Sequence, residues 1–278
     1  MANLDQLKTI KGFKDVSFDD HRCFLYEDHR WILPIIHFAQ ENGELPKPCT
    51  IVSFDAHHDT VTPTCLEEIE TILKNGITLD QLIYLCKDNL TTLDDDWLKG
   101  GMELGLIDDA VIFGVQDSLH NEDDKVYNDQ LGNPHRIEVL DLFSVELQNQ
   151  GALSDLAKRS LYKYLWGILD WQLIPKNGFN FGTNLRKILL DFDLDCFTVS
   201  WRECNFAWPD KIFLKEFFTE STYYTTQGWN GKGFVDSLIK KAGLVTIALE
   251  PGCCGGKQES DDILKKTNKY LLDDRLGV

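Results

Sequence analysis

The sequence predicts an α/β fold of three layers, in which a mostly parallel central sheet lies between helices. Three observations lead to this prediction. Short β-rich apolar runs alternate with longer segments of helical period, which is typical of a parallel sheet covered by helices. Of the 278 residues 43% are hydrophobic, including seven Trp and sixteen Phe, which is enough to fill one large core. No repeat, low-complexity tract or linker interrupts the chain, so residues 1–278 are expected to form a single domain.

The predicted elements follow one another in a regular order. Apolar runs predict six strands, at Arg22–Glu27, Thr50–Phe54, Ala110–Gly114, Ile137–Leu142, Lys187–Phe192 and Leu244–Leu249. Helical periodicity predicts helices at 30–42, 66–76, 95–105, 153–165, 209–220, 231–242 and 258–272. Before the fifth strand, residues 166–186 carry Pro, Gly and Asn in numbers that suit a surface excursion.

The net charge and the distribution of apolar residues indicate which kinds of partner the protein can bind. The formal net charge of −17 argues against a nucleic-acid partner, because binding phosphates requires a basic surface. A cationic substrate fits this charge better, although acidity for solubility explains it equally well. The segment MANLDQLKTIKGFK lacks an apolar centre and no run of about 18 apolar residues occurs, so we expect a cytoplasmic protein with no membrane partner. The eight cysteines lack zinc-ribbon spacing and are expected to be free thiols.

Acidic residues and histidines gather directly after predicted strands, in YEDHR (26–30), SFDAHHD (53–59), LLDFDLD (189–195) and IALEPG (247–252). The carboxyl ends of parallel strands meet at one edge of a sheet, which is where ligands bind. A single acidic loop is more often a solvated turn or a helix cap. Four such loops at one edge indicate a functional site.

The segment DAHHD is the sharpest local signal. Continued alternation after the strand sends Asp55, His57 and Asp59 to one side of the chain. Ala56 and His58 then point elsewhere. Three potential ligands on one side predict a metal site.

The segment DFDLD repeats this logic with Asp191, Asp193 and Asp195, the first of which still lies within the strand. Carboxylates at this density raise one another's pKa unless a cation neutralises them. Together with His29, which follows a third strand, the clusters offer about four carboxylates and two imidazoles. Such a set of oxygen and nitrogen ligands is typical of a Mn²⁺ site rather than of a zinc site with thiolate ligands.

In these positions the sequence resembles the ureohydrolase superfamily, which includes arginases, agmatinases and, more distantly, histone-deacetylase-like amidohydrolases. The signature of that superfamily is a Gly-Gly-Asp-His-like turn, then Asp-Ala-His-x-Asp, then Asp-x-Asp after a later strand. Asp28–His29 is similar to the first element, Asp55–Asp59 matches the second fully, and Asp193–Asp195 matches the third. The resemblance implies an arginase-like α/β fold with two Mn²⁺ ions per chain.

The resemblance also implies a role for each residue. It puts His29 and Asp59 on one metal, His57 and Asp195 on the other, and Asp55 and Asp193 between them. Glu250 stands where arginases keep a guanidinium-binding acid, the alternative being a cap of the helix at 258–272. Asp59 is implied to pass a proton to the departing amine. His120 and His58 are the two candidates for a proton shuttle.

Three departures from the family pattern bear on the substrate. The first turn lacks both glycines, and the third element lacks the Asp-Pro that usually follows. DAHHDTVTPTC also lacks the Asn and Ser-Gly-Asn-x-His elements with which arginases grip free arginine. The chain thereby resembles a divergent branch that includes peptide-modifying arginases, which convert arginine in precursor peptides to ornithine. The implied activity is a binuclear manganese hydrolase that releases urea from an arginine-containing peptide or a small guanidino substrate.

Two alternatives stay open at this stage. A single-zinc deacetylase of an acylated amine also has an Asp-x-His and an acid-glycine turn similar to ALEPG. Deacetylases of this class normally lack the second metal, so Asp59 and His29 would have no metal to bind. The other alternative is a non-catalytic, metal-stabilised peptide-binding module, against which the complete ligand set counts. The sequence leaves assembly into a homo-oligomer open.

Overall fold

The computed structural model describes residues 3–18, 21–114, 126–140, 187–201, 204–218 and 231–277. The chain divides into two compact units. The larger one comprises Met1–Leu142, Lys187–Trp208 and Ala242–Val278, and the smaller one comprises Phe143–Arg186 and Pro209–Lys241. The single domain expected over residues 1–278 stays a prediction. The helix and the surface excursion expected within 153–186 lie outside the described residues.

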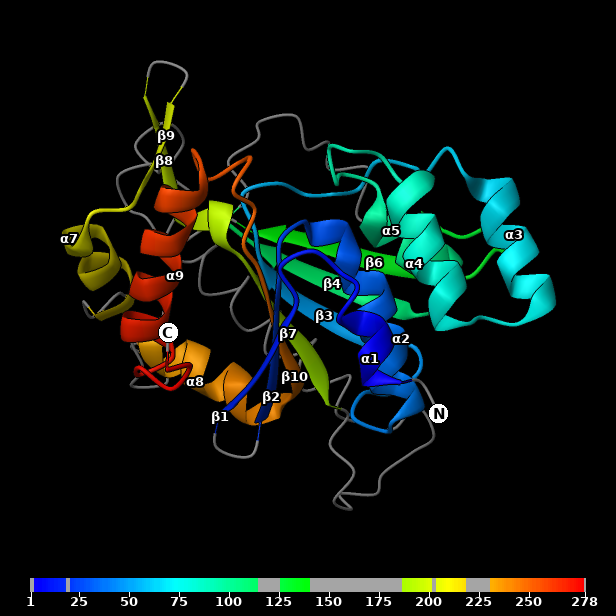
Figure 1. Ribbon diagram of the computed structural model, residues 1–278, viewed down its shortest axis with the longest axis horizontal. Coiled ribbons are helices and arrows are strands. Elements are labelled where there is room, and N and C mark those ends of the chain that lie inside the picture. Colours follow the sequence, from blue (N-terminus) through cyan, green and yellow to red (C-terminus); the bar gives the residue numbers. More distant parts are fainter. Residues whose placement is uncertain are drawn as a thin grey trace. The chain divides into compact units, whose positions relative to one another are not determined.

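The larger unit contains a mostly parallel sheet of eight strands with flanking helices, which confirms the predicted fold class (Figure 1). In chain order the strands are β1 (Lys14–Phe18), β2 (His21–Tyr26), β3 (Cys49–Phe54), β4 (Ile107–Phe113), β5 (Val126–Asn128), β6 (Pro134–Leu140), β7 (Ile188–Asp193) and β10 (Ala242–Ala248). Their spatial order is β1-β2-β10-β7-β3-β4-β6-β5. The six inner strands run parallel, and β1 and β5 pair antiparallel at the two edges.

Helices of the larger unit flank this sheet. They are α1 (Leu4–Leu7), α2 (Ile32–Glu41), α3 (Leu66–Asn75), α4 (Leu79–Asp88), α5 (Trp97–Glu103) and α9 (Lys257–Leu271), with 3-10 turns η1 (His29–Trp31) and η4 (Leu194–Phe197). Figure 1 shows α1, α2, α4 and α5 on one side of the strands and α9 on the other. A two-stranded hairpin of β8 (Thr198–Trp201) and β9 (Cys204–Ala207) follows η4. The smaller unit contains α7 (Asp210–Phe213), the π-helical η5 (Leu214–Phe218) and α8 (Gly231–Lys241).

Alternation along the buried strands sorts their side chains between two faces. On one face Phe54 of β3 stacks with Phe113 of β4 and Phe192 of β7, at ring-centroid distances of 5.3 and 5.1 Å. On the other face Ile51 and Leu189 join the core formed with α2. Phe54 and Phe192 are also partners in the strand register, so the chain leaves β3 and β7 side by side at the same edge.

The predicted elements agree with most of these bounds. All six predicted strands are present, and the predicted strand 137–142 is described as far as residue 140. The helix expected at 209–220 is divided into α7 and η5. Helix α4 was not predicted, although Thr78 and Gln81 form a capping box at its start. Among the described residues no helix is both long and apolar enough to cross a membrane.

Candidate metal centre

The candidate site residues, Glu250 included, follow four strands that are neighbours in the sheet, in the order β2-β10-β7-β3. His29 comes shortly after β2, Asp193 ends β7, and Asp55 follows β3 directly. Parallel pairing continues beyond the ends of β2 and β10, because the backbone N–H of Glu250 donates to the carbonyl oxygen of Glu27 at 2.9 Å. Residues from distant parts of the sequence therefore meet at one edge, as the sequence predicted.

His29 is buried, with 1% of its surface exposed. Its Nδ1 atom faces Oδ2 of Asp193 at 2.9 Å, Oδ2 of Asp59 at 3.3 Å and Oδ2 of Asp55 at 3.4 Å. One ring nitrogen thus lies among three carboxylates from two separate segments.

His57 and Asp195 lie beside this first set. The Nδ1 atom of His57 is 2.9 Å from Oδ2 of Asp195 and 3.9 Å from Oδ1 of Asp55. Backbone N–H groups orient the carboxylates: that of His57 donates to Asp55 Oδ1 at 2.7 Å, and that of Asp195 donates to Asp193 Oδ1 at 3.0 Å. The His57 side chain is 53% exposed, so the cluster opens to solvent on this side.

These side chains form two groups whose ligand atoms lie within 4.8 Å of one another. One group is His29, Asp55 and Asp193, and the other is Asp55, His57 and Asp59. Asp55 belongs to both groups, so they are neighbours. Nδ1 of His29 and Oδ2 of Asp195 are buried and make no hydrogen bond among the described residues. Imidazole nitrogens and carboxylate oxygens at this spacing could hold a divalent metal ion.

Burial and neighbouring charges shift the pKa values of these carboxyl and imidazole groups. Burial raises the pKa of Asp55 to about 8, and Asp59 adds to the rise. Burial also raises the pKa of Asp193 well above its ordinary value. For His29 burial acts to lower the pKa, but Asp191 and Asp193 outweigh it and raise the pKa well above its ordinary value. Without a cation the cluster therefore retains protons, which a bound metal ion would displace.

Comparison of the sequence with protein-family models and with curated proteins gives no match.

Trp97, the first residue of α5, contacts two of the candidate ligands. Its indole Nε1–H donates to Asp59 Oδ2 at 2.5 Å, and its ring lies 4.5 Å from the ring of His29, centroid to centroid. Asp59 has a left-handed backbone, with φ of 47°, which is uncommon for a residue other than glycine. The buried indole of Trp97 thus fixes the carboxylate of Asp59, whose backbone is left-handed.

Glu250 lies directly beside His29. Its carboxylate Oε1 accepts a hydrogen bond from the backbone N–H of His29 at 2.5 Å, and 7% of its surface is exposed. Burial raises the pKa of Glu250 to about 8, and Asp94 adds to the rise. Helix α9 begins at Lys257 and has Gly256 as its N-cap residue, so the alternative role of Glu250 as its cap is wrong.

The two proton-shuttle candidates differ in what the structure describes. His58 is half-buried, and its Nδ1 atom lies 2.7 Å from the hydroxyl oxygen of Thr60. His120 lies outside the described residues. Strand β3 ends at Phe54 and the backbone is left-handed at Asp59, yet the ligand atoms of Asp55, His57 and Asp59 meet as predicted.

Asp191 belongs to neither ligand group. Its side chain is fully buried on β7, and its Oδ2 atom lies 2.9 Å from Nε2 of His29. Burial acts to raise the pKa of Asp191, but His29, Thr246 and Ser53 outweigh it and lower the pKa. A carboxylate anion therefore lies buried within the sheet, beside His29 of the candidate metal centre.

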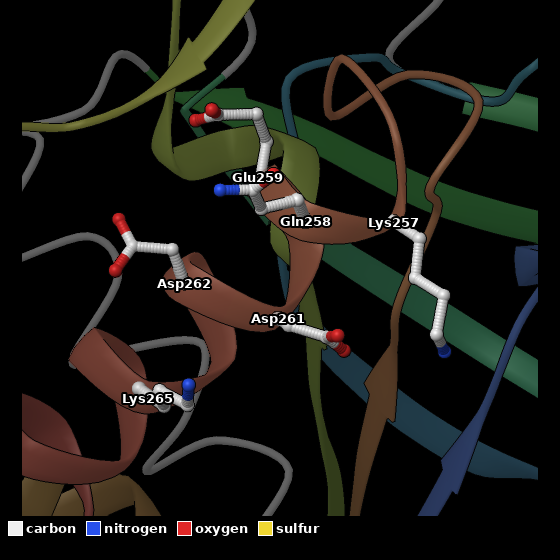
Figure 2. A pocket seen from close by; sticks show the side chains of 6 residues that line it. All are labelled: Lys257, Gln258, Glu259, Asp261, Asp262 and Lys265. Atoms are coloured by element: carbon white, nitrogen blue, oxygen red, sulfur yellow. The ribbon is translucent and has the colours of Figure 1, made fainter.

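A hollow on α9 shares no residue with this centre. Its lining is Lys257, Gln258, Glu259, Asp261, Asp262 and Lys265 (Figure 2). Glu259 accepts a hydrogen bond from the backbone N–H of Ala207, and Asp262 pairs with Lys266 at 2.7 Å. The lining side chains carry both signs of charge, and two of the three acids already have local partners. This hollow does not favour one ligand, so we place the candidate site at the carboxyl edge of the sheet.

The eight cysteines are free thiols, as predicted. Cys196, next to a candidate ligand, is buried, and its Sγ atom contacts the carbonyl oxygen of Phe113 at 3.7 Å. Trp97 and Asp191 were not assigned roles from the sequence. For Asp191 the sequence offered one signal, which was its position within the predicted strand, whereas the other two acids of LLDFDLD follow that strand.

Proposed function

We propose that this centre holds two divalent cations, Mn²⁺ in the native protein, and hydrolyses the guanidino group of arginine within a peptide. The observation that carries the proposal is the pair of ligand groups that share Asp55. A carboxylate common to two groups is suited to bridge two cations, as in two-metal hydrolases. The cations would be held by His29, Asp55, His57, Asp59, Asp193 and Asp195.

The side chains have separate tasks in this proposal. When bound, the two cations would supply Lewis acidity and a water molecule that is nucleophilic at neutral pH. Asp55 and Asp193 are oriented by backbone N–H groups, so their carboxylates need no rearrangement to bind. Asp59 would accept protons from the attacking water on Oδ1 and pass them to the leaving nitrogen, because its Oδ2 already accepts the indole N–H of Trp97.

Glu250 would bind the guanidinium group of the substrate. A charge-assisted pair between carboxylate and guanidinium is strong and directional. The hydrogen bond from the backbone of His29 to Oε1 fixes this carboxylate beside the first ligand group. The reaction consumes one water and breaks the bond between Cζ and Nε of arginine. Its products are urea and an ornithine side chain.

The loop after Asp59 supports a peptide substrate over free arginine. Residues 60–64 read TVTPT and carry no charge that could pair with a free α-amino or α-carboxylate group. Val61 and Leu93 are 41% and 79% exposed, and the backbone N–H of Val61 donates to the carbonyl oxygen of Asp95. Exposed apolar side chains on two connected loops suit contact with a peptide chain. The net charge of −17 would attract its cationic arginine.

The experiment combines a manganese titration with a urea assay on an arginine-containing peptide and on free arginine. We expect two Mn²⁺ per chain, urea release from the peptide, and loss of CH₂N₂ from each converted arginine by mass spectrometry. Asp55→Asn and Asp193→Asn should abolish urea release. Fewer than two metals per chain, or full activity in either variant, would overturn the two-metal proposal.

Two further substrates sharpen the assignment. Free arginine turned over as fast as the peptide would remove the peptide part of the proposal. An acetyllysine peptide serves as the counter-substrate, and its deacetylation without urea release would favour the deacetylase alternative instead.

A further inference from the structure

We propose that Asp191 is a positioning residue that fixes the ring of His29, so that Nδ1 rather than Nε2 binds a cation. This inference rests on the proposed two-cation function and concerns a residue outside the six ligands. Asp191 is a charged group with 0% exposure in the middle of the sheet. Burying a carboxylate is costly unless hydrogen bonds compensate, so such a residue requires an explanation.

Three hydroxyl groups surround the carboxylate of Asp191. The strand register places Asp191 between Ser53 of β3 and Thr246 of β10. The hydroxyl of Ser53 donates to Oδ2 at 2.7 Å, and that of Thr246 donates to Oδ1 at 2.6 Å. The hydroxyl of Tyr26, at the end of β2, donates to Oδ1 at 3.3 Å. Hydroxyl donors on β2, β3 and β10 therefore hold both oxygen atoms of this carboxylate in place.

The remaining contact of Asp191 is with His29. Oδ2 of Asp191 lies 2.9 Å from Nε2 of the imidazole. An ionised carboxylate only accepts hydrogen bonds, so Nε2 must carry the hydrogen of the neutral ring. Nδ1 then carries the lone pair, and Nδ1 is the atom that faces the carboxylates of the metal centre. The order carboxylate, histidine, metal is one that orients a ligand and raises its basicity.

The first test is the tautomer of His29 in the full chain loaded with Zn²⁺, a diamagnetic probe. Long-range ¹H–¹⁵N correlation spectra distinguish the two ring nitrogens, and His29→Asn identifies the signal. We expect hydrogen on Nε2 and the metal-induced shift on Nδ1. Metal ligation through Nε2 would overturn the inference. This measurement uses the unaltered protein and so does not depend on any variant of Asp191 folding.

The second test is the affinity of Asp191→Asn for Mn²⁺, counted by electron paramagnetic resonance of the free ion. Loss of a partner behind a metal ligand is expected to weaken binding by about 10- to 100-fold. Glu103→Gln is the matched control, because Glu103 is also a buried carboxylate that accepts hydrogen bonds, from Tyr127 and Gln130. Among the described residues its hydrogen bonds do not involve a candidate ligand. Its Mn²⁺ affinity should equal that of the unaltered protein.

The outcomes separate this inference from the function on which it rests. If the unaltered chain binds neither Mn²⁺ nor Zn²⁺, the two-cation proposal fails and this inference fails with it. If the unaltered chain binds two ions and Asp191→Asn binds them as tightly as Glu103→Gln does, only the role of Asp191 is overturned. Ten-fold or greater weakening confined to Asp191→Asn, with hydrogen on Nε2 in the unaltered chain, supports it.

Discussion

Replacing Trp97 with Phe isolates one hydrogen bond at the candidate metal centre. The change removes the indole N–H that donates to Asp59 Oδ2 at 2.5 Å, and it keeps an aromatic ring in contact with His29. Asp59 would then keep its buried carboxylate without this donor. We expect weaker binding of the cation that Asp59 is proposed to hold, because the carboxylate is no longer fixed toward it.

The size of the effect follows from the strength of that bond. A hydrogen bond to a charged group contributes about 1.5–3 kcal/mol. Since about 1.4 kcal/mol corresponds to a tenfold change in an equilibrium constant, Mn²⁺ affinity should fall by roughly 10- to 100-fold. The smaller ring also leaves a cavity, which lowers the stability of the metal-free protein as well.

Trp31→Phe is the matched control, because it makes the same chemical change at a buried tryptophan. The indole Nε1 of Trp31 makes no hydrogen bond among the described residues. Mn²⁺ titration of both variants, followed by electron paramagnetic resonance, compares them directly. Equal affinities for two ions in Trp97→Phe and Trp31→Phe would refute the assignment of Trp97 as a support of Asp59.

Three other perturbations give independent tests. Glu250→Gln should lower kcat/KM for the arginine peptide by roughly 100-fold while leaving Mn²⁺ affinity unchanged, so a matching loss of Mn²⁺ would contradict a substrate role. In the metal-free protein Asp55 has a pKa raised from 3.8 to about 8, so the folded state retains a proton that the unfolded chain releases. The Tm of the metal-free protein should therefore fall as pH rises from 3.8 to about 8 and level off above that range. Mn²⁺ should suppress the fall, and a Tm that does not change with pH in the metal-free protein would contradict this reasoning. Gly255→Ala should cost at least about 1–3 kcal/mol in urea unfolding, because φ is 92° and a Cβ would lie 2.0 Å from the carbonyl oxygen of Asn205, whereas Gly252→Ala meets nothing within 4 Å and should be neutral.

The sheet and the ligand cluster were predictable because local patterns carried them. Parallel strands such as β3 and β7 are buried on both faces and appear in the sequence as short apolar runs. Their carboxyl ends share an edge, so acids directly after Phe54 and within LLDFDLD were bound to meet. His29 could be added because a third strand precedes it. The order of strands was not needed for that step.

Contacts made only in three dimensions were not predictable. Trp97 precedes no ligand motif, and its hydrogen bond to Asp59 depends on how α5 packs beside the loop after β3. The role of Asp191 depends on Ser53 and Thr246 being its partners in the register, which no single-strand pattern specifies. Helix α4 was missed although its apolar residues Leu79, Leu82 and Leu85 are buried, since its short segment follows α3 almost directly.

The order of strands has a consequence for when the candidate metal centre can form. During synthesis β2, β3 and β7 are all complete before β10, yet β10 separates β2 from β7 in the finished sheet. His29 therefore has no fixed place beside Asp193 until the last strand inserts between them. The ligand group that contains His29 is therefore expected to be complete only after β10 is in place, whereas Asp55, His57 and Asp59 all follow one strand, β3. An ion held by His29, Asp55 and Asp193 would then report that β10 has taken its place between β2 and β7.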